Sequence, residues 1–481
     1  MINQELVDGK SRLSRRRSLI ISGLGAMLVV IVGSLAVDPG LPGTPLKSAS
    51  AANRSKRNQS KGVTKKSPVK GPVRRAAPPP PPHEPEEVTP SDYEAFDAPL
   101  DEPFRGRMRT FREPSRPPPL DTVPVSFDGR IAFSPRLPSM KSRFSGRIAA
   151  VTDRNEFAFY TFDPDLQDYV EGLVRRSPDN HLAIVAMEPM TGRVLALAGH
   201  SVSLRDPMFH NGYPAASLFK VVTAAAAVEH ASVTPEHLVR FRGGDYTLER
   251  HNFRADPRRD NRSMTIGEAM GRSANPVFGR IALEALSPRI LGSVAHDFGF
   301  NEDLRADVPV PQSRAYIPQD DYELARTGAG FGEVTITPVH AASMVSGVAN
   351  GGNLLRPIFV DKVLSPTGAL LYRSRPTIVS RMISQHAAQT VFEMMENTTS
   401  IGTGRRAFTD RGRPVFPHIH IAAKTGTLNG TNPAGLTRWF IAVAPRERPR
   451  IALAIVAVHP GRPRGNPSFY GRQILGRYFG S

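Results

Sequence analysis

Three short motifs contain the residue types needed for acyl transfer through a serine. They are Ser217-Leu218-Phe219-Lys220, Ser273-Ala274-Asn275 and Lys424-Thr425-Gly426-Thr427, in that order along the chain. A serine hydroxyl is a weak nucleophile until a neighbouring base removes its proton. Because Ser217 and Lys220 are three residues apart, they share one face of a helix and the amine can reach the hydroxyl. The first motif therefore predicts a serine nucleophile with a lysine as its base.

The other polar residues of the motifs have expected roles around this pair. Lys220 acts as a base only when it is neutral, and burial together with a second cation, for which Lys424 is the candidate, would lower its pKa. We expect Ser273 to pass a proton between Lys220 and the leaving amine. Asn275 is expected to bind the substrate peptide through its side-chain amide. The Ser217 N–H, at the start of a helix, is an expected donor to the oxyanion.

The third motif follows Ile419, Ile421, Ala422 and Ala423, which are apolar and typical of a strand. Gly426 has no Cβ, so a substrate can approach the backbone closely, and an extended peptide could pair with this strand edge. We expect Thr425, Thr427 and Lys424 to bind a terminal carboxylate. The Thr427 N–H is the expected second oxyanion donor.

Each motif taken alone has a structural explanation. Ser67-Pro68-Val69-Lys70 repeats the spacing of the first motif in a segment where no folded site is expected. Ser273-Ala274-Asn275 could cap a helix before Pro276, and Lys424-Thr425-Gly426 could end a strand. The order of the three motifs and the elements expected around them favour the catalytic interpretation.

Hydrophobic periodicity predicts the elements that would position these motifs. Strands are expected at residues 123–133, 147–162, 182–187, 194–198, 419–427, 437–444 and 450–458. Helices are expected at residues 166–174, 217–230, 265–286, 338–349, 384–397 and 467–479. Strands near both ends, with helices between them, predict one antiparallel sheet with an inserted helical region.

Together the motifs resemble the set found in penicillin-binding proteins and serine β-lactamases. Similarity to penicillin-binding transpeptidase domains extends over about residues 155–480, with further matches at 160–170, 183–198, 328–352, Gly402-Thr403-Gly404 and Arg438-Trp439-Phe440. The resemblance implies a mixed α/β fold with a five-stranded antiparallel sheet, helices on both faces and a helical subdomain. It also implies that Ser217 attacks the D-alanyl-D-alanine carbonyl of peptidoglycan stem peptides. D-alanine would leave, an amine or water would resolve the acyl-enzyme, and β-lactams would inhibit by acylating the same serine.

Several activities share this resemblance. No glycosyltransferase region is recognised, and residues 121–155 are too few for a long N-terminal pedestal, so a short, monofunctional, class B-like transpeptidase is expected. No motif distinguishes it from a D,D-carboxypeptidase. For a β-lactamase, Glu393-Met394-Met395-Glu396-Asn397 has the letters of a deacylating motif but lies late in the chain, where an exposed helix face is the simpler interpretation. A non-catalytic β-lactam sensor or wall-binding module is the hypothesis from another class.

The N-terminal region predicts a membrane anchor. Residues 18–37 are uncharged and largely apolar, and Arg15, Arg16 and Arg17 precede them. About 20 apolar residues span a bilayer core, and the arginines place residues 1–17 in the cytoplasm. We expect a single-pass anchor in the bacterial cytoplasmic (inner) membrane with the catalytic domain on the periplasmic, extracytoplasmic side. A signal peptide cleaved after Ser34-Leu35-Ala36 is the alternative.

Composition restricts the partners and cofactors. The chain has 481 residues, a net charge of +18 and no cysteine. The missing thiols exclude disulfides, cysteine-ligated zinc and a thiol nucleophile, and we expect neither a metal nor a cofactor. The positive charge favours anionic partners such as anionic lipid or wall polymers.

The remaining organisation follows from local composition. Residues 38–120 are rich in proline and charge and are expected to be a linker, which acts as a tether or a simple spacer. Residues 121–155 are expected to form a short strand module, and 156–481 the transpeptidase domain. Because the linker would lie outside the cytoplasm, nucleic acid is not an expected partner. Cell-wall synthesis proteins are candidate partners.

Overall fold

The computed structural model describes residues 121–123, 125–127, 131–133, 137–461 and 465–480. All of them belong to one of the chain's two units, Asp97–Ser481. The predictions of a cytoplasmic tail, a membrane anchor and a linker concern residues 1–120, which lie outside the described residues. Within the described ranges, no helix combines the length and apolar character needed to cross a membrane.

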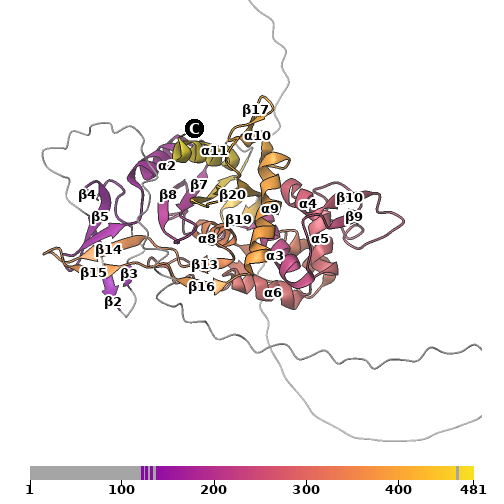
Figure 1. Ribbon diagram of the computed structural model, residues 1–481, viewed down its shortest axis with the longest axis horizontal. Helices are drawn as coiled ribbons and strands as arrows, with labels where there is room; N and C mark the ends of the chain where they lie inside the picture. Colours follow the sequence, from indigo (N-terminus) through magenta and orange to yellow (C-terminus); the bar gives the residue numbers. More distant parts are fainter. Residues whose placement is uncertain (1–120, 124, 128–130, 134–136, 462–464, 481) are drawn as a thin grey trace, which may run out of the picture. The chain divides into compact units, whose positions relative to one another are not determined.

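A five-stranded antiparallel sheet forms the centre of the fold (Figure 1). Its spatial order is β19-β20-β21-β7-β8. The strands are β7 (His181–Met187), β8 (Val194–Ser201), β19 (Ala422–Thr431), β20 (Ala434–Ala444) and β21 (Ile451–His459). β7 is buried along its whole length, so both faces of the sheet must be covered by other elements. The predicted sheet, built from both ends of the domain, is confirmed.

Helices cover the two faces of this sheet. On one face α2 (Pro164–Arg176), α10 (Arg405–Phe408) and α11 (Pro467–Phe479) pack with residues such as Phe440. On the other face α8 (Pro338–Ala349) packs with residues such as Trp439. Trp439 and Phe440 are consecutive residues of β20. Because successive residues of a strand point to opposite faces, they belong to the hydrophobic cores on opposite sides of the sheet. The fold is therefore the predicted layered arrangement.

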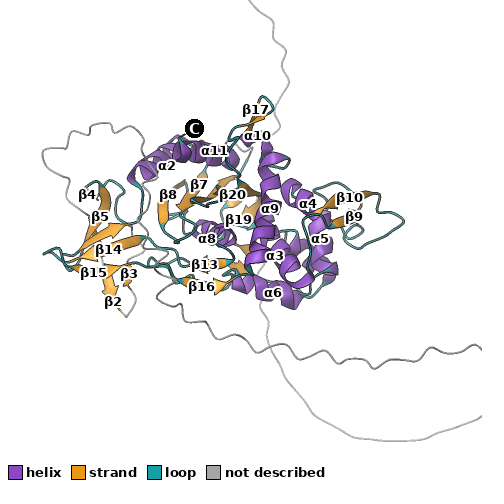
Figure 2. Cartoon of the chain, viewed as in Figure 1, coloured by secondary structure: helices purple, strands orange, loops and turns teal. Residues whose placement is uncertain are grey.

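The predicted helical region is inserted between β8 and β19 (Figure 2). Its elements are η1 (Ala216–Leu218), α3 (Phe219–Ala231), α4 (Ile266–Arg272), α5 (Asn275–Glu284), α6 (Pro288–Asp297), α7 (Asp321–Gly328) and α9 (Gln385–Ser400). Residues 265–286 are mostly helical, as expected, and they form two helices rather than one. Ser273 ends α4 in a left-handed conformation with φ 60°, and α5 begins at Asn275.

Short two-stranded sheets accompany the helical region. They pair β9 (Leu238–Phe241) with β10 (Arg262–Thr265), β11 (Arg314–Ala315) with β12 (Val334–Thr335), β13 (Asn353–Leu355) with β16 (Ile378–Arg381) and β17 (Thr409–Asp410) with β18 (Arg413–Pro414). The β9–β10 pair encloses a long arginine-rich segment that bears on the site described below.

A second sheet combines the strands expected near the N-terminus with two later strands. Its members are β1 (Asp121–Val123), β4 (Arg143–Phe144), β5 (Arg147–Thr152), β6 (Phe157–Tyr160), β14 (Val360–Leu364) and β15 (Leu370–Arg373), and β2 (Val125–Phe127) pairs separately with β3 (Ile131–Phe133). The last two strands of the sheet, β14 and β15, were not expected, because they are short and lack a continuous apolar pattern. Asp361 of β14 binds Arg147 and Arg193 at 2.8 and 2.7 Å, which ties this sheet to the turn between β7 and β8.

Candidate active site

Ser217 lies in η1, a short 3-10 turn that leads directly into α3. The helix expected from residue 217 therefore begins two residues later, at Phe219. Ala216, just before the serine, has a left-handed φ of 51°. The chain that enters this turn is held by the sheet, because the buried Trp439 donates its indole N–H to the Pro214 carbonyl at 2.9 Å. The turn thus holds the serine in a tightly constrained backbone.

Lys220 lies beside the Ser217 hydroxyl and is completely buried. Its Nζ is 2.8 Å from Ser217 Oγ, 2.8 Å from Asn275 Oδ1 and 2.6 Å from the Ala329 carbonyl oxygen. Burial, and then the nearby charge of Lys424, holds the pKa of Lys220 well below its usual value. Such an environment favours the neutral form of the amine.

The partners of Lys220 determine where its lone pair points. A neutral amine has two N–H donors and one lone pair, and the oxygens of Asn275 and Ala329 accept hydrogen bonds but have no proton to donate. When both N–H groups are given to these two oxygens, the lone pair is left for the Ser217 hydroxyl. The arrangement is able to remove the serine proton.

Lys424 is also completely buried and joins the second motif to the third. Its Nζ donates to Ser273 Oγ at 2.8 Å and to the Thr425 carbonyl oxygen at 2.9 Å. Burial lowers the pKa of Lys424 to about 7. Ser273 was expected to contact Lys220, but the hydrogen bond of its hydroxyl is to Lys424.

The third motif lies on β19, at one edge of the five-stranded sheet. The strand begins at Ala422 rather than at residue 419, and it continues to Thr431. A Cβ on Gly426 would lie 3.3 Å from Ala216 Cβ, so this strand packs directly against the turn that carries the serine. Thr427 is exposed, so its side chain and backbone are open to a substrate. The first and third motifs are thus in contact.

A threonine that the motifs do not include joins the third motif to α4, the helix that precedes the second motif. Thr403 shares a hydroxyl hydrogen bond with Thr425, and its backbone N–H donates to the Gly271 carbonyl of α4 at 3.0 Å. A Cβ on Gly402 would lie 2.0 Å from that carbonyl, so only glycine permits this approach. The resemblance had singled out this Gly-Thr-Gly stretch without a role.

Two further contributors are backbone groups that motif spacing did not predict. The first is the Ala329 carbonyl, which accepts a hydrogen bond from Lys220. The second is the backbone of Gly330, which lies against the serine turn with φ +92°, so that a Cβ there would be 2.4 Å from the Ala216 carbonyl oxygen. The alternating glycines at residues 328, 330 and 332 are the sequence signal for this approach. A residue type cannot reveal a carbonyl contact.

Asn275 of the second motif is held on three sides. Its Oδ1 faces Lys220, its Nδ2 donates to the Tyr246 carbonyl at 2.8 Å, and its backbone N–H donates to the Asp245 carbonyl at 2.7 Å. These contacts use one N–H of the side-chain amide and leave the other unused. The contacts from the segment around Asp245 had no signal in the sequence.

The glutamates of the possible β-lactamase motif have other partners. Glu393 and Glu396 on α9 bind Arg446 at 2.9 and 3.2 Å. Asn397 packs against Gly271 of α4. These structural contacts explain why the three residues are present, and no role in deacylation is needed to explain them.

Comparisons with known proteins agree with this geometry. The family model described as penicillin binding protein transpeptidase domain matches residues 182–477. The peptidoglycan D,D-transpeptidase PbpA of Mycobacterium tuberculosis is 27% identical over 310 residues, which cover 57% of this chain and 61% of that protein. The stage V sporulation protein D of Bacillus subtilis is 26% identical over 316 residues, covering 61% of this chain and 47% of that protein. The chain thus spans about half to three fifths of the length of these relatives.

A solved structure shares the fold. The penicillin G acyl-enzyme complex of penicillin-binding protein A from M. tuberculosis superposes with a TM-score of 0.53 at 26% identity. The superposition covers 69% of this chain and 80% of that one. The similarity therefore includes most of the described residues.

Proposed function

The chain belongs to the penicillin-binding protein transpeptidase family, and we propose that it cross-links peptidoglycan stem peptides as a serine D,D-transpeptidase. One observation supports this above all: the buried Lys220 amine is 2.8 Å from Ser217 Oγ and has acceptor oxygens for both of its own protons. A relative that is named a peptidoglycan D,D-transpeptidase adds support for this substrate.

In the proposed acylation step, Lys220 takes the proton of Ser217 while Oγ forms a bond to the carbonyl carbon of the penultimate D-alanine. The backbone N–H groups of Ser217 and Thr427 donate to the resulting oxyanion. Collapse of this intermediate breaks the C–N bond, and the leaving nitrogen of D-alanine takes a proton from Ser273. Lys424, at 2.8 Å, returns a proton to Ser273. The product is an ester on Ser217, a protonated Lys220 and a neutral Lys424.

Deacylation reverses these proton movements with a different amine. The amine of a second stem peptide attacks the ester carbonyl and gives a proton to Ser273, which passes one to Lys424. The C–O bond breaks, and Ser217 Oγ regains its proton from Lys220. Asn275 binds the donor peptide through its free N–H, and Thr425, Gly426, Thr427 and Lys424 receive the backbone and terminal carboxylate. β-Lactams would inhibit the protein by forming the corresponding ester.

The setting of this chemistry is part of the same proposal. Residues 18–37 would anchor the chain in the bacterial cytoplasmic membrane, and residues 38–120 would link the anchor to an extracytoplasmic catalytic domain. Cell-wall synthesis proteins would then be its neighbours. The uncharged run of residues 18–37 after three arginines supports this placement.

Product analysis with a synthetic stem peptide tests the proposed reaction. The full chain is incubated with a pentapeptide that ends in D-alanyl-D-alanine and with an amine acceptor, and products are separated by mass. We expect released D-alanine together with a new amide, and we expect both to be lost in Ser217→Ala. Ser67→Ala is a matched control, because Ser67 has the same spacing to a lysine, and it should behave as wild type. D-alanine without amide at any acceptor concentration would contradict transfer in favour of hydrolysis.

A further inference from the structure

The segment between β9 and β10 contacts the second motif through backbone carbonyls. The Asn275 backbone N–H donates to the Asp245 carbonyl at 2.7 Å, and Asn275 Nδ2 donates to the Tyr246 carbonyl at 2.8 Å. Asn275 is also 96% buried, so its amide has few other partners. Two neighbouring carbonyls therefore hold both the main chain and the side chain of this residue.

The Tyr246 carbonyl determines which way the Asn275 amide faces. A carbonyl oxygen only accepts hydrogen bonds, so the NH₂ end of the amide must be on its side. The oxygen end then faces Lys220, at 2.8 Å from Nζ. If the amide turned over, its N–H would donate to the lone pair of the neutral Lys220, and that lone pair would no longer be available to Ser217. The orientation of Asn275 thus decides whether Lys220 can act as a base.

Two arginines hold the Asp245–Tyr246 pair in position. Arg262 binds Asp245 Oδ1 at 2.6 Å and also donates to the Gly243 carbonyl at 2.7 Å. Arg272, at the end of α4, lies 3.3 Å from the other oxygen of Asp245. The Asp245 side chain is only 15% exposed, which keeps solvent from competing fully for these contacts. Asp245 is therefore anchored to β10 and to the helix that precedes Ser273.

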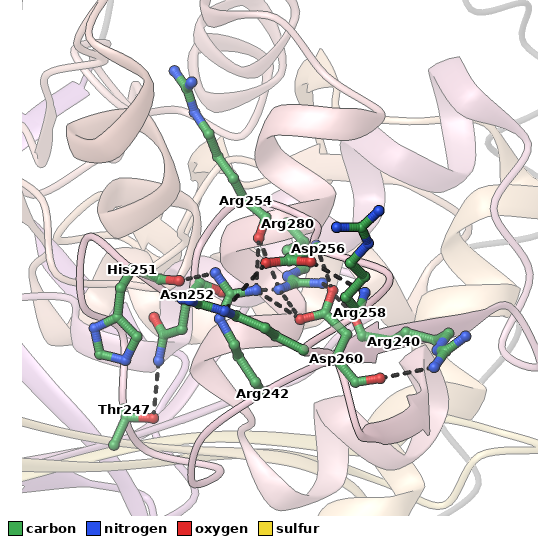
Figure 3. A network of polar contacts seen from close by, with 11 residues as sticks. Arg240, Arg242, Thr247, His251, Asn252, Arg254, Asp256, Arg258, Asp260 and Arg280 are labelled. Atoms are coloured by element: carbon green, nitrogen blue, oxygen red, sulfur yellow. Dashed lines mark hydrogen bonds and ion pairs between the residues drawn. The ribbon is translucent and has the colours of Figure 1, made fainter.

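A buried ionic network fixes the base of the same segment (Figure 3). Asp260 binds Arg280 at 2.5 Å and Arg242 at 2.8 Å, and Arg280 also donates to the Asn252 carbonyl at 3.1 Å. The side chains of Arg280 and Asp260 are 1% and 3% exposed. Arg280 lies on α5, the helix that begins with Asn275. The segment is thus attached to α5 at its first residue and again further along the helix.

We propose that Asp245 is a positioning residue, which keeps the Tyr246 carbonyl on the Asn275 amide and so directs the Lys220 lone pair at Ser217. Asp245 acts through Arg262 and Arg272 and does not touch the reacting atoms. This inference rests on the proposed function, since it concerns the rate of serine acylation.

The test separates the acylation rate constant k2 from the constant K for non-covalent binding of a fluorescent penicillin, with the full chain. We expect Asp245→Asn and Arg262→Ala each to lower k2 about tenfold and to leave K within twofold of wild type. The double variant should lose no more of k2 than either single variant, because both changes break the same Asp245–Arg262 ion pair. Arg258→Ala is the control, since Arg258 is exposed in the same segment and binds Asp256 through its backbone N–H. It should match wild type.

Other outcomes would overturn the proposal. A k2 within twofold of wild type in Asp245→Asn, a change confined to K, additive losses in the double variant, or an equal loss in Arg258→Ala would each do so. If thermal unfolding shows that Asp245→Asn does not fold, Arg272→Gln tests the same contact from the more exposed side, with the same expected loss in k2. No acylation of the wild-type chain would contradict the proposed function itself, which keeps the two failures distinct.

Discussion

Replacing Gly330 with alanine should slow acylation strongly without unfolding the protein. A Cβ at this position would lie 2.4 Å from the Ala216 carbonyl oxygen and 2.9 Å from the Ser217 nitrogen. Both atoms are backbone, so no flexible side chain is able to move aside. Because real Cβ atoms stay beyond 3.0 Å, the Ala216 carbonyl must retreat by about 0.6 Å. Such a shift moves the turn that carries the serine and its expected oxyanion N–H.

The size of the effect follows from this displacement. A misplacement of about 1 Å can cost about 100-fold in rate, so a shift of 0.6 Å predicts a loss of about 10- to 100-fold. That loss corresponds to about 1.4–2.7 kcal/mol in the activation free energy. A side chain at a left-handed φ adds about 1–2 kcal/mol of strain, which lowers the free energy of unfolding.

A second glycine separates the clash from the strain. Gly368, between β14 and β15, has φ +88°, close to the +92° of Gly330, but a Cβ there would meet nothing within 4 Å. Gly368→Ala should therefore lose the stability that corresponds to the backbone strain alone, and none of the acylation rate. Both variants are compared by stopped-flow labelling with a fluorescent penicillin and by urea unfolding. If Gly330→Ala acylates within threefold of Gly368→Ala, the close approach of residue 330 to the serine turn does not matter for catalysis.

Four further predictions follow from buried charged groups. Lys220→Met should lower the acylation rate about 10²- to 10⁴-fold, the usual contribution of a general base, while thermal unfolding shows an intact fold; a loss below tenfold would exclude Lys220 as the base. Because the pKa of Lys424 lies at about 7, its positive charge disappears above that pH, and k2/K for a penicillin carboxylate should fall as pH rises through 7; a value still rising at pH 9 would contradict this. Arg280→Met leaves the buried Asp260 carboxylate with Arg242 as its remaining ion-pair partner and should cost about 3 kcal/mol in urea unfolding, so a cost below about 1 kcal/mol would refute the burial argument. Burial raises the pKa of Asp307 to about 6, so its contribution to stability is greatest below its unfolded pKa, and about 3 kcal/mol of the free energy of unfolding is lost as pH rises through 6. The free energy of unfolding should therefore fall less steeply over this pH range in Asp307→Asn than in wild type, and equal slopes would contradict the prediction.

The elements predicted well are those with a strong local signal. The helices expected at 338–349 and 467–479 match α8 and α11, because each begins with a capping residue followed by proline and ends at asparagine or glycine. The central strands are long apolar runs, which few other structures can bury. For these segments the local preference and the tertiary structure agree.

The differences arise where tertiary contacts decide the local structure. A helix boundary near Ser273 has a local signal in Pro276, but nothing in residues 265–286 indicates that the Ser273 hydroxyl contacts Lys424, a partner 151 residues away. β14 and β15 are short, and the second of them is largely exposed, so no hydrophobic period marks them. The place of β14 is set by pairing with β6, a strand about 200 residues earlier, and β15 in turn pairs with β14.

In the site, the contributing side chains could be predicted from the sequence, whereas the contributing backbone groups could not. Polar side chains at fixed spacing predicted Ser217, Lys220 and Lys424 as a group, and the structure brings these residues together with Asn275. The carbonyls of Ala329 and Tyr246 complete the surroundings of this group. Every residue has a carbonyl, so only the fold reveals which ones take part.

The most direct test of the acyl-serine mechanism is to locate the bond. The full chain is treated with penicillin G, its intact mass is measured, and the modified peptide is mapped by fragmentation. We predict a single adduct of the mass of penicillin G on Ser217, absent in Ser217→Ala and retained in Ser67→Ala. A folded wild-type chain without an adduct, or with the adduct on another residue, would contradict the account.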